Sequence, residues 1–290
     1  MEKELIEHQH FEGERALFKK TNAEINNCVF DNGESPLKEC KNLSLRDCIF
    51  GYKYPLWYGE GFEVRNCTFL EMARAGIWYT KDSTFKHLVI YAPKEFRHAN
   101  SIVIEDVKFE KADETLWWCY DVTLKNSYAK GFYLLMQSKN VLVDHLQLDG
   151  DYAFDGGENI IVRHSVLHTK DAFWNCKNVI IEDSEIDGEY FGWNSENVTL
   201  IRCKVRSHQG FCYMKEIKLI DCVIENSDLT FEYCSDINAN VTSEIDSVKN
   251  PLSGSIKAKN IKTIIRDDLS INPNATQIEI QNEKGEYHAV

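Results

Sequence analysis

Apolar residues recur along the chain in a short motif whose spacing stays nearly constant. In each copy an apolar residue is followed three positions later by a small or apolar residue, as in Ile25-Asn-Asn-Cys28 and Leu200-Ile-Arg-Cys203. The second residue of the motif lies at 28, 48, 67, 88, 107, 127, 146, 165, 184, 203 and 222. The gaps are 20, 19, 21, 19 and 20, and then 19 five times in succession. The sequence therefore predicts one supersecondary unit that is repeated eleven times.

Several columns of apolar residues define the inside of this repeat. If the small residue is position 0, positions −3, +2 and −11 are apolar in nearly every copy, and position −5 is apolar in most. Positions −5 and −3, like 0 and +2, are two residues apart, which is the strand period. Positions −3 and 0 are three residues apart, and an unbroken strand would place them on opposite faces. Because both are apolar, the chain must bend at −2 and −1. Position −1 is always Asn, Asp, His or Arg, and the first three tolerate the positive φ that a corner often demands.

Short strands, a corner and a return to the same columns predict a coil of parallel strands that stack about 4.8 Å apart. A column of amides at position −6 supports this, because stacked amides can hydrogen-bond from coil to coil. Its members are Asn22, Asn42, Asn140, Asn159, Asn178 and Asn197. We expect an all-β protein, a single-stranded right-handed parallel β-helix of about eleven coils at 17–242, with an N-terminal cap at 1–16 and C-terminal cap strands at 243–290.

The Ile-x-Asn-Cys-x-Phe repeat and the Asn column resemble the right-handed parallel β-helix of the pectin-lyase-like superfamily, over roughly residues 17–240. More specifically, the chain is similar to a bacterial family known only as domain of unknown function 3737. This resemblance implies a fold and no established activity. A left-handed hexapeptide helix is the alternative fold, but it needs a strict multiple of six residues, which gaps of 19 to 21 do not fit.

Composition narrows the classes of partner. The chain has 33 Lys and Arg against 46 Asp and Glu, a net charge of −13. Nucleic acids and anionic membranes need clustered cations, so neither is expected as a partner. The N-terminal segment lacks a basic stretch followed by an apolar core, and we expect a cytoplasmic protein. The ten Cys fall largely on inward columns, so we interpret them as buried free thiols and expect no metal and no cofactor.

Aromatic residues gather on columns that we expect to face outward. Position −10 varies between apolar and charged residues, namely Trp57, Trp78, Arg97, Trp117, Met136, Asp155, Trp174, Trp193 and Cys212. Position −9 adds Tyr58, Tyr79, His98, Trp118 and Tyr213, and position −13 adds Tyr54, Tyr133, Tyr152 and Tyr190. Contiguous exposed rings usually mark a binding surface. The predicted substrate-binding residues are Trp57, Trp78, Arg97, Trp117, Tyr152, Trp174 and Trp193.

Two kinds of partner suit such a stripe. An oligo- or polysaccharide can stack its sugar faces on the rings, and a second copy of the chain can use the same rings as interface anchors. The alternative is a purely structural role, in which the rings lie flat across neighbouring coils and cover the core. Saccharide recognition is our leading hypothesis, and a structural homo-oligomer is an alternative.

Catalysis is the other alternative. Glycoside hydrolysis needs two carboxyl groups within about 5–10 Å of each other. Asp155 and Asp171 lie on neighbouring copies within the densest acidic patch, so they are the predicted acid and base of a glycoside hydrolase or polysaccharide lyase. Connections of only five to seven residues between coils argue against catalysis, because a nearly bare coil excludes water poorly.

A metal site is a further alternative at the corner column. His145 and His164 fall on adjacent copies, and Asp183 follows on the next copy. Two imidazoles stacked about 4.8 Å apart can share a metal ion. Corner geometry explains the same residues without a metal.

Overall fold

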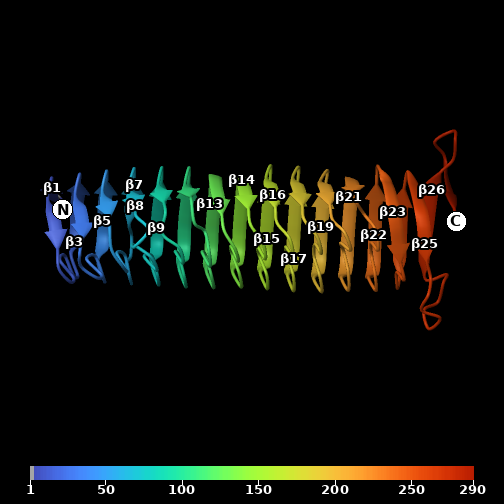
Figure 1. The fold of residues 1–290 in the computed structure, drawn as a ribbon, viewed down its shortest axis with the longest axis horizontal. Coiled ribbons are helices and arrows are strands. Elements are labelled where there is room, and N and C mark those ends of the chain that lie inside the picture. Colours follow the sequence, from blue (N-terminus) through green and yellow to red (C-terminus); the bar gives the residue numbers. More distant parts are fainter. Residues whose placement is uncertain (1–2) are drawn as a thin grey trace. The chain divides into compact units, whose positions relative to one another are not determined.

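The computed structural model describes residues 3–290 and consists of strands and turns, with no helix among these residues. Two compact units are distinguished, Met1–Asp149 and Gly150–Val290, and each is described by itself. In Figure 1 the strands of each unit follow one another as successive coils.

The N-terminal unit contains β1 (Glu4–Glu7), β2 (His10–Glu12), β3 (Thr21–Asn26), β4 (Val29–Asp31), β5 (Lys41–Arg46), β6 (Ile49–Phe50), β7 (Glu63–Arg65), β8 (Thr68–Phe69), β9 (Lys81–Lys86), β10 (Val89–Ile90), β11 (Asn100–Glu105), β12 (Lys108–Phe109), β13 (Tyr120–Lys130) and β14 (Lys139–Asp149). The C-terminal unit contains β15 (Glu158–Arg163), β16 (Val166–His168), β17 (Lys177–Glu182), β18 (Glu185–Asp187), β19 (Glu196–Ile201), β20 (Lys204–Arg206), β21 (Lys215–Glu225), β22 (Ser235–Val241), β23 (Glu244–Lys249), β24 (Gly254–Ala258), β25 (Asn260–Ile265), β26 (Thr276–Gln281) and β27 (Tyr287–Ala289).

The predicted stacking of repeats is confirmed by the strand register within each unit. Position −3 of one coil lies beside position −3 of the next, so that Ile25 pairs with Leu45 and Leu45 with Val64. In the C-terminal unit the corresponding neighbours are Val162, Ile181, Leu200 and Leu219. Every one of these pairings is parallel, so the predicted parallel β-helix is correct.

The corner at position −1 also forms as predicted. All eleven residues there have positive φ, between 47° at His164 and 55° at Asp47, Asp106 and His145. The corner separates a strand of three to six residues from one of two or three residues in most coils. The left-handed residue interrupts the alternation of inward and outward side chains. Positions −3 and 0 therefore both face inward.

The core is formed by the predicted columns. Side chains at positions −3, +2 and −11 are almost completely buried, apart from Leu17 in the first coils. Phe11, Phe30, Phe50 and Phe69 stack in a continuous row with ring centroids 4.7–5.2 Å apart. Gly192 departs from the apolar column at −11 because Met214 fills that place, and a Cβ at Gly192 would lie 2.8 Å from the sulfur of Met214.

The ten cysteines are all free and buried. Cys212 on column −10 is among them, although that column was expected to face outward. Burial raises the pKa of the Cys40, Cys119 and Cys176 thiols to about 12, with nearby backbone N–H groups opposing the shift. Protonated thiols of this kind act as compact apolar side chains.

The number of coils is larger than predicted, about 15 instead of about eleven. Segments assigned to the caps contribute strands to further coils. At the N-terminal end β1 pairs in parallel with β3, so that Ile6 lies beside Ile25. At the C-terminal end Ala239, Ile256 and Ile278 lie side by side on β22, β24 and β26. Their spacings of 17 and 22 residues depart from the regular repeat, which hid these coils in the sequence.

Candidate functional site

The tryptophans of column −10 are half-buried, whereas the sequence predicted that they point outward. Trp57 and Trp78 stack with ring centroids 5.5 Å apart in the N-terminal unit. Trp174 and Trp193 lie 5.8 Å apart in the C-terminal unit. Each pair covers the turn beneath it, so much of every indole ring contacts protein.

The indole N–H groups of this column are used inside the fold. Trp78 donates to the carbonyl oxygen of Lys94 at 2.7 Å, and Trp174 donates to the carbonyl oxygen of Tyr190 at 2.7 Å. Trp57 and Trp117 make the same contact with the carbonyl oxygens of Ala75 and Tyr133. Each acceptor lies in the turn of the following coil. These hydrogen bonds link each coil to the next. They favour the alternative in which the rings of column −10 cover the core and do not bind a ligand.

Arg97 continues the column where the sequence suggested an interruption. Its guanidinium carbon lies 5.0 Å from the ring centroid of Trp78 and 4.3 Å from that of Trp117. Glu114 forms an ion pair with Arg97 and another with Lys94. Burial opposes ionisation of Glu114, but these two cations outweigh it and hold the pKa of the carboxyl below its ordinary value. A cation between two indoles is a stabilising arrangement, so Arg97 is already occupied.

The most exposed aromatic column is position −9. Tyr58, Tyr79, His98 and Trp118 stack on successive coils of the N-terminal unit, with ring centroids 4.7, 5.1 and 5.2 Å apart and planes within 8° of parallel. Tyr58 is 46% exposed, Tyr79 40% and Trp118 43%. We call these four residues the ring ladder.

The ring ladder presents edges to solvent. The face of each ring packs against its neighbour, so the faces of Tyr79 and His98 are covered on both sides. Among the described residues, the phenol oxygens of Tyr58 and Tyr79 and the indole N–H of Trp118 have no hydrogen-bond partner in the protein. A row of polar ring edges about 5 Å apart is therefore available to a ligand. The next residue of the column is Gln137, so the row of rings ends at Trp118.

Charged side chains run beside the ladder at position −7. Glu60 lies between Lys41 and Lys81, with nitrogen–oxygen distances of 3.0 and 3.4 Å. Hydrogen bonds from these two ammonium groups lower the pKa of the Glu60 carboxyl. Asn100 follows in the same column and is exposed. The ladder is thus flanked by groups that donate and accept hydrogen bonds.

The two predicted catalytic carboxyl groups have different surroundings in the C-terminal unit. Asp155 is half-buried and accepts a hydrogen bond of 3.0 Å from the side-chain amide of Asn175. Asp171 is only 5% exposed, and burial raises the pKa of its carboxyl, with the ammonium of Lys170 opposing. No hydrogen bond joins the two carboxyl groups in the described part of the chain. Tyr152 is half-buried in the preceding turn at φ 62°.

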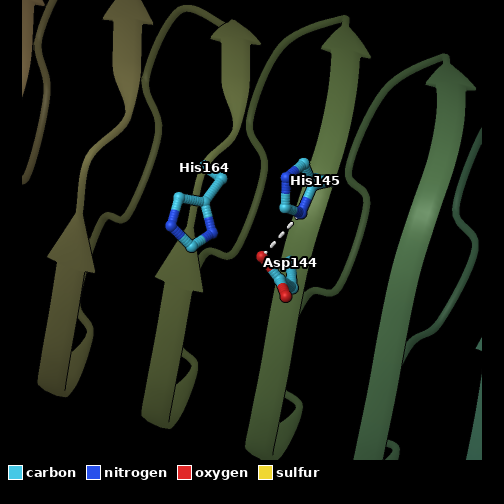
Figure 2. A group of neighbouring side chains, drawn as sticks. All are labelled: Asp144, His145 and His164. Carbon is cyan, nitrogen blue, oxygen red and sulfur yellow. Dashed lines mark ion pairs between the residues drawn. The ribbon is translucent and has the colours of Figure 1, made fainter.

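His145 and His164 of the corner column occupy left-handed positions, and Figure 2 labels both of them. His145 on β14 forms an ion pair with Asp144, with 2.9 Å between Nδ1 and the carboxylate oxygen (Figure 2). Asp183 accepts two hydrogen bonds from Arg202, at 2.7 and 2.6 Å, which lower the pKa of its carboxyl. Asp183 is thus engaged by Arg202, whereas ligand atoms of Asp144, His145 and His164 lie within 4.8 Å of one another (Figure 2). The metal alternative at His145 and His164 stays a prediction.

Taken together, the fold and the ladder define a class: a parallel β-solenoid whose N-terminal unit carries an exposed row of stacked rings. Within this class the chain belongs to the family described as "Protein of unknown function (DUF3737)", whose family model matches residues 4–279. The family resemblance expected from the repeat is thereby confirmed. The wider relation to the pectin-lyase-like superfamily stays a prediction.

Solved structures with some likeness to this chain come from several organisms. The A-module of the mannuronan C-5 epimerase AlgE4 of Azotobacter vinelandii is 8% identical, with 97% of this chain and 90% of that one covered and a TM-score of 0.32. A tailspike protein of E. coli bacteriophage HK620 in complex with a pentasaccharide is 11% identical, with 89% and 62% covered and a TM-score of 0.30. The pentapeptide repeat protein HetL of Nostoc sp. strain PCC 7120 is 9% identical, with 79% and 89% covered and a TM-score of 0.26.

Identities and scores this low say nothing about activity. Among curated proteins, none matches the sequence. Within residues 3–290 no helix has the length and apolar character needed to cross a membrane.

Proposed function

We propose that this protein recognises a saccharide, and that the ring ladder of the N-terminal unit is the contact surface. The observation that carries the proposal is the exposed column of Tyr58, Tyr79, His98 and Trp118, whose polar atoms face solvent. Amphipathic rings of this kind favour partners that are partly apolar and partly polar, and an oligosaccharide is such a partner.

The ladder suits a chain that runs along the coils. Its rings repeat about every 5 Å, a spacing that allows successive sugar units to meet successive ring edges. Hydroxyl groups of the glycan would hydrogen-bond to the tyrosine oxygens and the Trp118 N–H. Glu60 and Asn100 beside the ladder would take further hydroxyl groups.

Substitution on the ladder tests the proposal. We expect wild type to bind at least one oligosaccharide on a glycan array, and we expect Tyr79→Ala and Trp118→Ala to weaken that binding about three- to tenfold each, since an aromatic contact contributes about 0.5–1.5 kcal/mol. Tyr91→Ala is the matched control, because Tyr91 is an equally exposed ring of the same unit, 44% accessible, that lies off the ladder. Absence of glycan binding, or equal loss in all three variants, would refute the proposal.

The rival enzymatic function has one observation in its favour. The buried carboxyl of Asp171 has a raised pKa, as a general acid requires. If a hydrolase or lyase acted here with Asp155 as its second carboxyl, turnover of an oligosaccharide would disappear in Asp171→Asn. The homo-oligomer alternative predicts instead a mass, by light scattering, that rises with concentration and falls in Trp118→Ala.

A further inference from the structure

A hollow of about 130 Å³ lies on β3, β5 and β7 of the N-terminal unit, on columns other than the ring ladder. Its polar lining consists of Glu24, Asn26, Ser44, Arg46, Glu63 and Arg65. These residues occupy positions −4 and −2, which point outward from the first long strand of the coil.

Two exposed arginines stand side by side in this hollow. Arg46 lies directly beside Arg65 in the strand register. Neither guanidinium has an ion pair or a hydrogen bond with another described side chain, although the next cation of the column, Lys86, pairs with Glu105 at 2.5 Å. Like charges opposite each other on neighbouring strands destabilise a sheet. An anion between the two guanidiniums would remove this repulsion and accept hydrogen bonds from both.

The other end of the hollow carries the carboxylates of Glu24 and Glu63. Ser44 lies between Glu24 and Glu63 in the register of the three strands. The hydroxyl of Ser44 accepts a hydrogen bond of 2.6 Å from the ammonium of Lys3. This ammonium lies between Glu24 and Glu63, about 7 Å from the arginine pair, the length of two strand residues. A ligand donor that binds the two carboxylates takes the place of Lys3. Ionised carboxylates accept hydrogen bonds, so this end favours a donor.

We propose that the hollow binds a small molecule with a carboxylate at one end and hydrogen-bond donors at the other, the chemistry shared by sugar acids and amino acids. The carboxylate of the ligand lies between Arg46 and Arg65. Its hydroxyl or ammonium groups donate to Glu24 and Glu63. Because the hollow and the ring ladder lie on different columns, this site is independent of the saccharide surface.

Calorimetric titration of the full chain at matched ionic strength tests both ends of the site. The probes are D-galacturonate, D-galactose, which lacks the carboxylate, acetate, which lacks the donors, and 4-aminobutyrate, which replaces the hydroxyl groups by an ammonium. We expect saturable binding of galacturonate or 4-aminobutyrate, and the stronger of the two identifies the donor. Galactose and acetate should bind at least tenfold more weakly, because each loses one set of charge-assisted hydrogen bonds.

Single substitutions separate this site from a general charge effect. Arg65→Gln should weaken binding at least tenfold, whereas Arg74→Gln, at another exposed arginine of the same unit, should leave it unchanged. Without ligand at low ionic strength, Arg65→Gln should melt at a higher temperature than wild type because the repulsion is gone, and with saturating ligand the order should reverse. Tyr79→Ala should bind as wild type does. The proposal is overturned if neither galacturonate nor 4-aminobutyrate binds saturably, or if Arg65→Gln binds as tightly as wild type.

Discussion

At the scale of single residues, the buried polar groups are the features that the apolar columns do not explain. Glu95 is completely buried, next to the core residue Phe96. Both of its carboxyl oxygens accept a hydrogen bond from the backbone N–H of Gly76, at 3.0 and 2.9 Å. A Cβ at Gly76 would lie 2.6 Å from the carboxyl, so this glycine makes the contact possible. Burial raises the pKa of the Glu95 carboxyl well above its ordinary value.

This carboxyl makes the stability of the protein depend on pH. The folded state holds the proton more tightly than the unfolded chain, so the contribution is complete below the ordinary pKa of 4.5 and is lost as the pH rises toward the folded value. We expect Glu95→Gln to remove this loss and to unfold at higher urea concentration than wild type at pH 8, with little difference at pH 4. The slope that disappears is at most about 1.4 kcal/mol per pH unit. Glu14→Gln, at an exposed position, should follow wild type throughout, and parallel curves for all three proteins would contradict the prediction.

At the scale of the coil, the sequence predicted the strands, the corner and the exposed rings of column −9, but it did not predict that the rings of column −10 are half-buried. The corner could be predicted because Asn, Asp and His, which tolerate a left-handed backbone, recur at position −1 of the repeat. In the turn the backbone is left-handed at both −11 and −9, as at Phe96 and His98 or Leu116 and Trp118. Two left-handed residues around one position abolish the alternation of inward and outward side chains. The alternation of side chains along a strand therefore cannot predict that column −10 is half-buried and column −9 exposed.

The residue types did contain a usable signal. Trp is the commonest residue of column −10, and its N–H needs a partner when it is partly buried, whereas column −9 mixes Tyr, His and Trp with Gln and Asn. That mixture of polar-tipped side chains is typical of a surface. The carboxyl pair Asp155 and Asp171 was predicted from acidic density and repeat spacing, and neither shows which carboxyl groups are already engaged by burial or by an amide neighbour.

The different roles of the two columns can be measured on one pair of variants. Trp78→Phe removes the N–H that satisfies the Lys94 carbonyl and should lower the free energy of unfolding by about 1–2 kcal/mol. Trp118→Phe keeps an exposed ring and loses an N–H that points to solvent, so its free energy of unfolding should change by less than about 0.5 kcal/mol. Chemical denaturation measures both, and a larger loss in Trp118→Phe than in Trp78→Phe would reverse our assignment.

At the scale of the molecule, the repeat makes the protein nearly one-dimensional. Within each unit the strands of a coil pair in parallel with those of the neighbouring coils, and side chains stack from coil to coil. In such an array stability is close to a sum of coil and nearest-neighbour terms. A destabilising substitution in one coil should therefore lower the stability of that coil and a few neighbours but not of distant coils, whereas in a globular core it would destabilise the whole domain.

Phe50→Ala in the N-terminal unit tests this locality. Phe50 stacks between Phe30 and Phe69 and is fully buried, so truncation should cost about 3–5 kcal/mol locally. The amides of Ile49 and Thr68, which donate to Cys28 and Cys48 across the affected coils, should exchange with solvent at least tenfold faster than in wild type. The amide of Tyr128, which donates to Val107 several coils away, should keep its wild-type rate. Hydrogen exchange followed by NMR or mass spectrometry distinguishes the two sites. If the protection of Tyr128 fell as much as that of Thr68, the unit would unfold as one cooperative block, and its stability could not be treated as a sum over neighbouring coils.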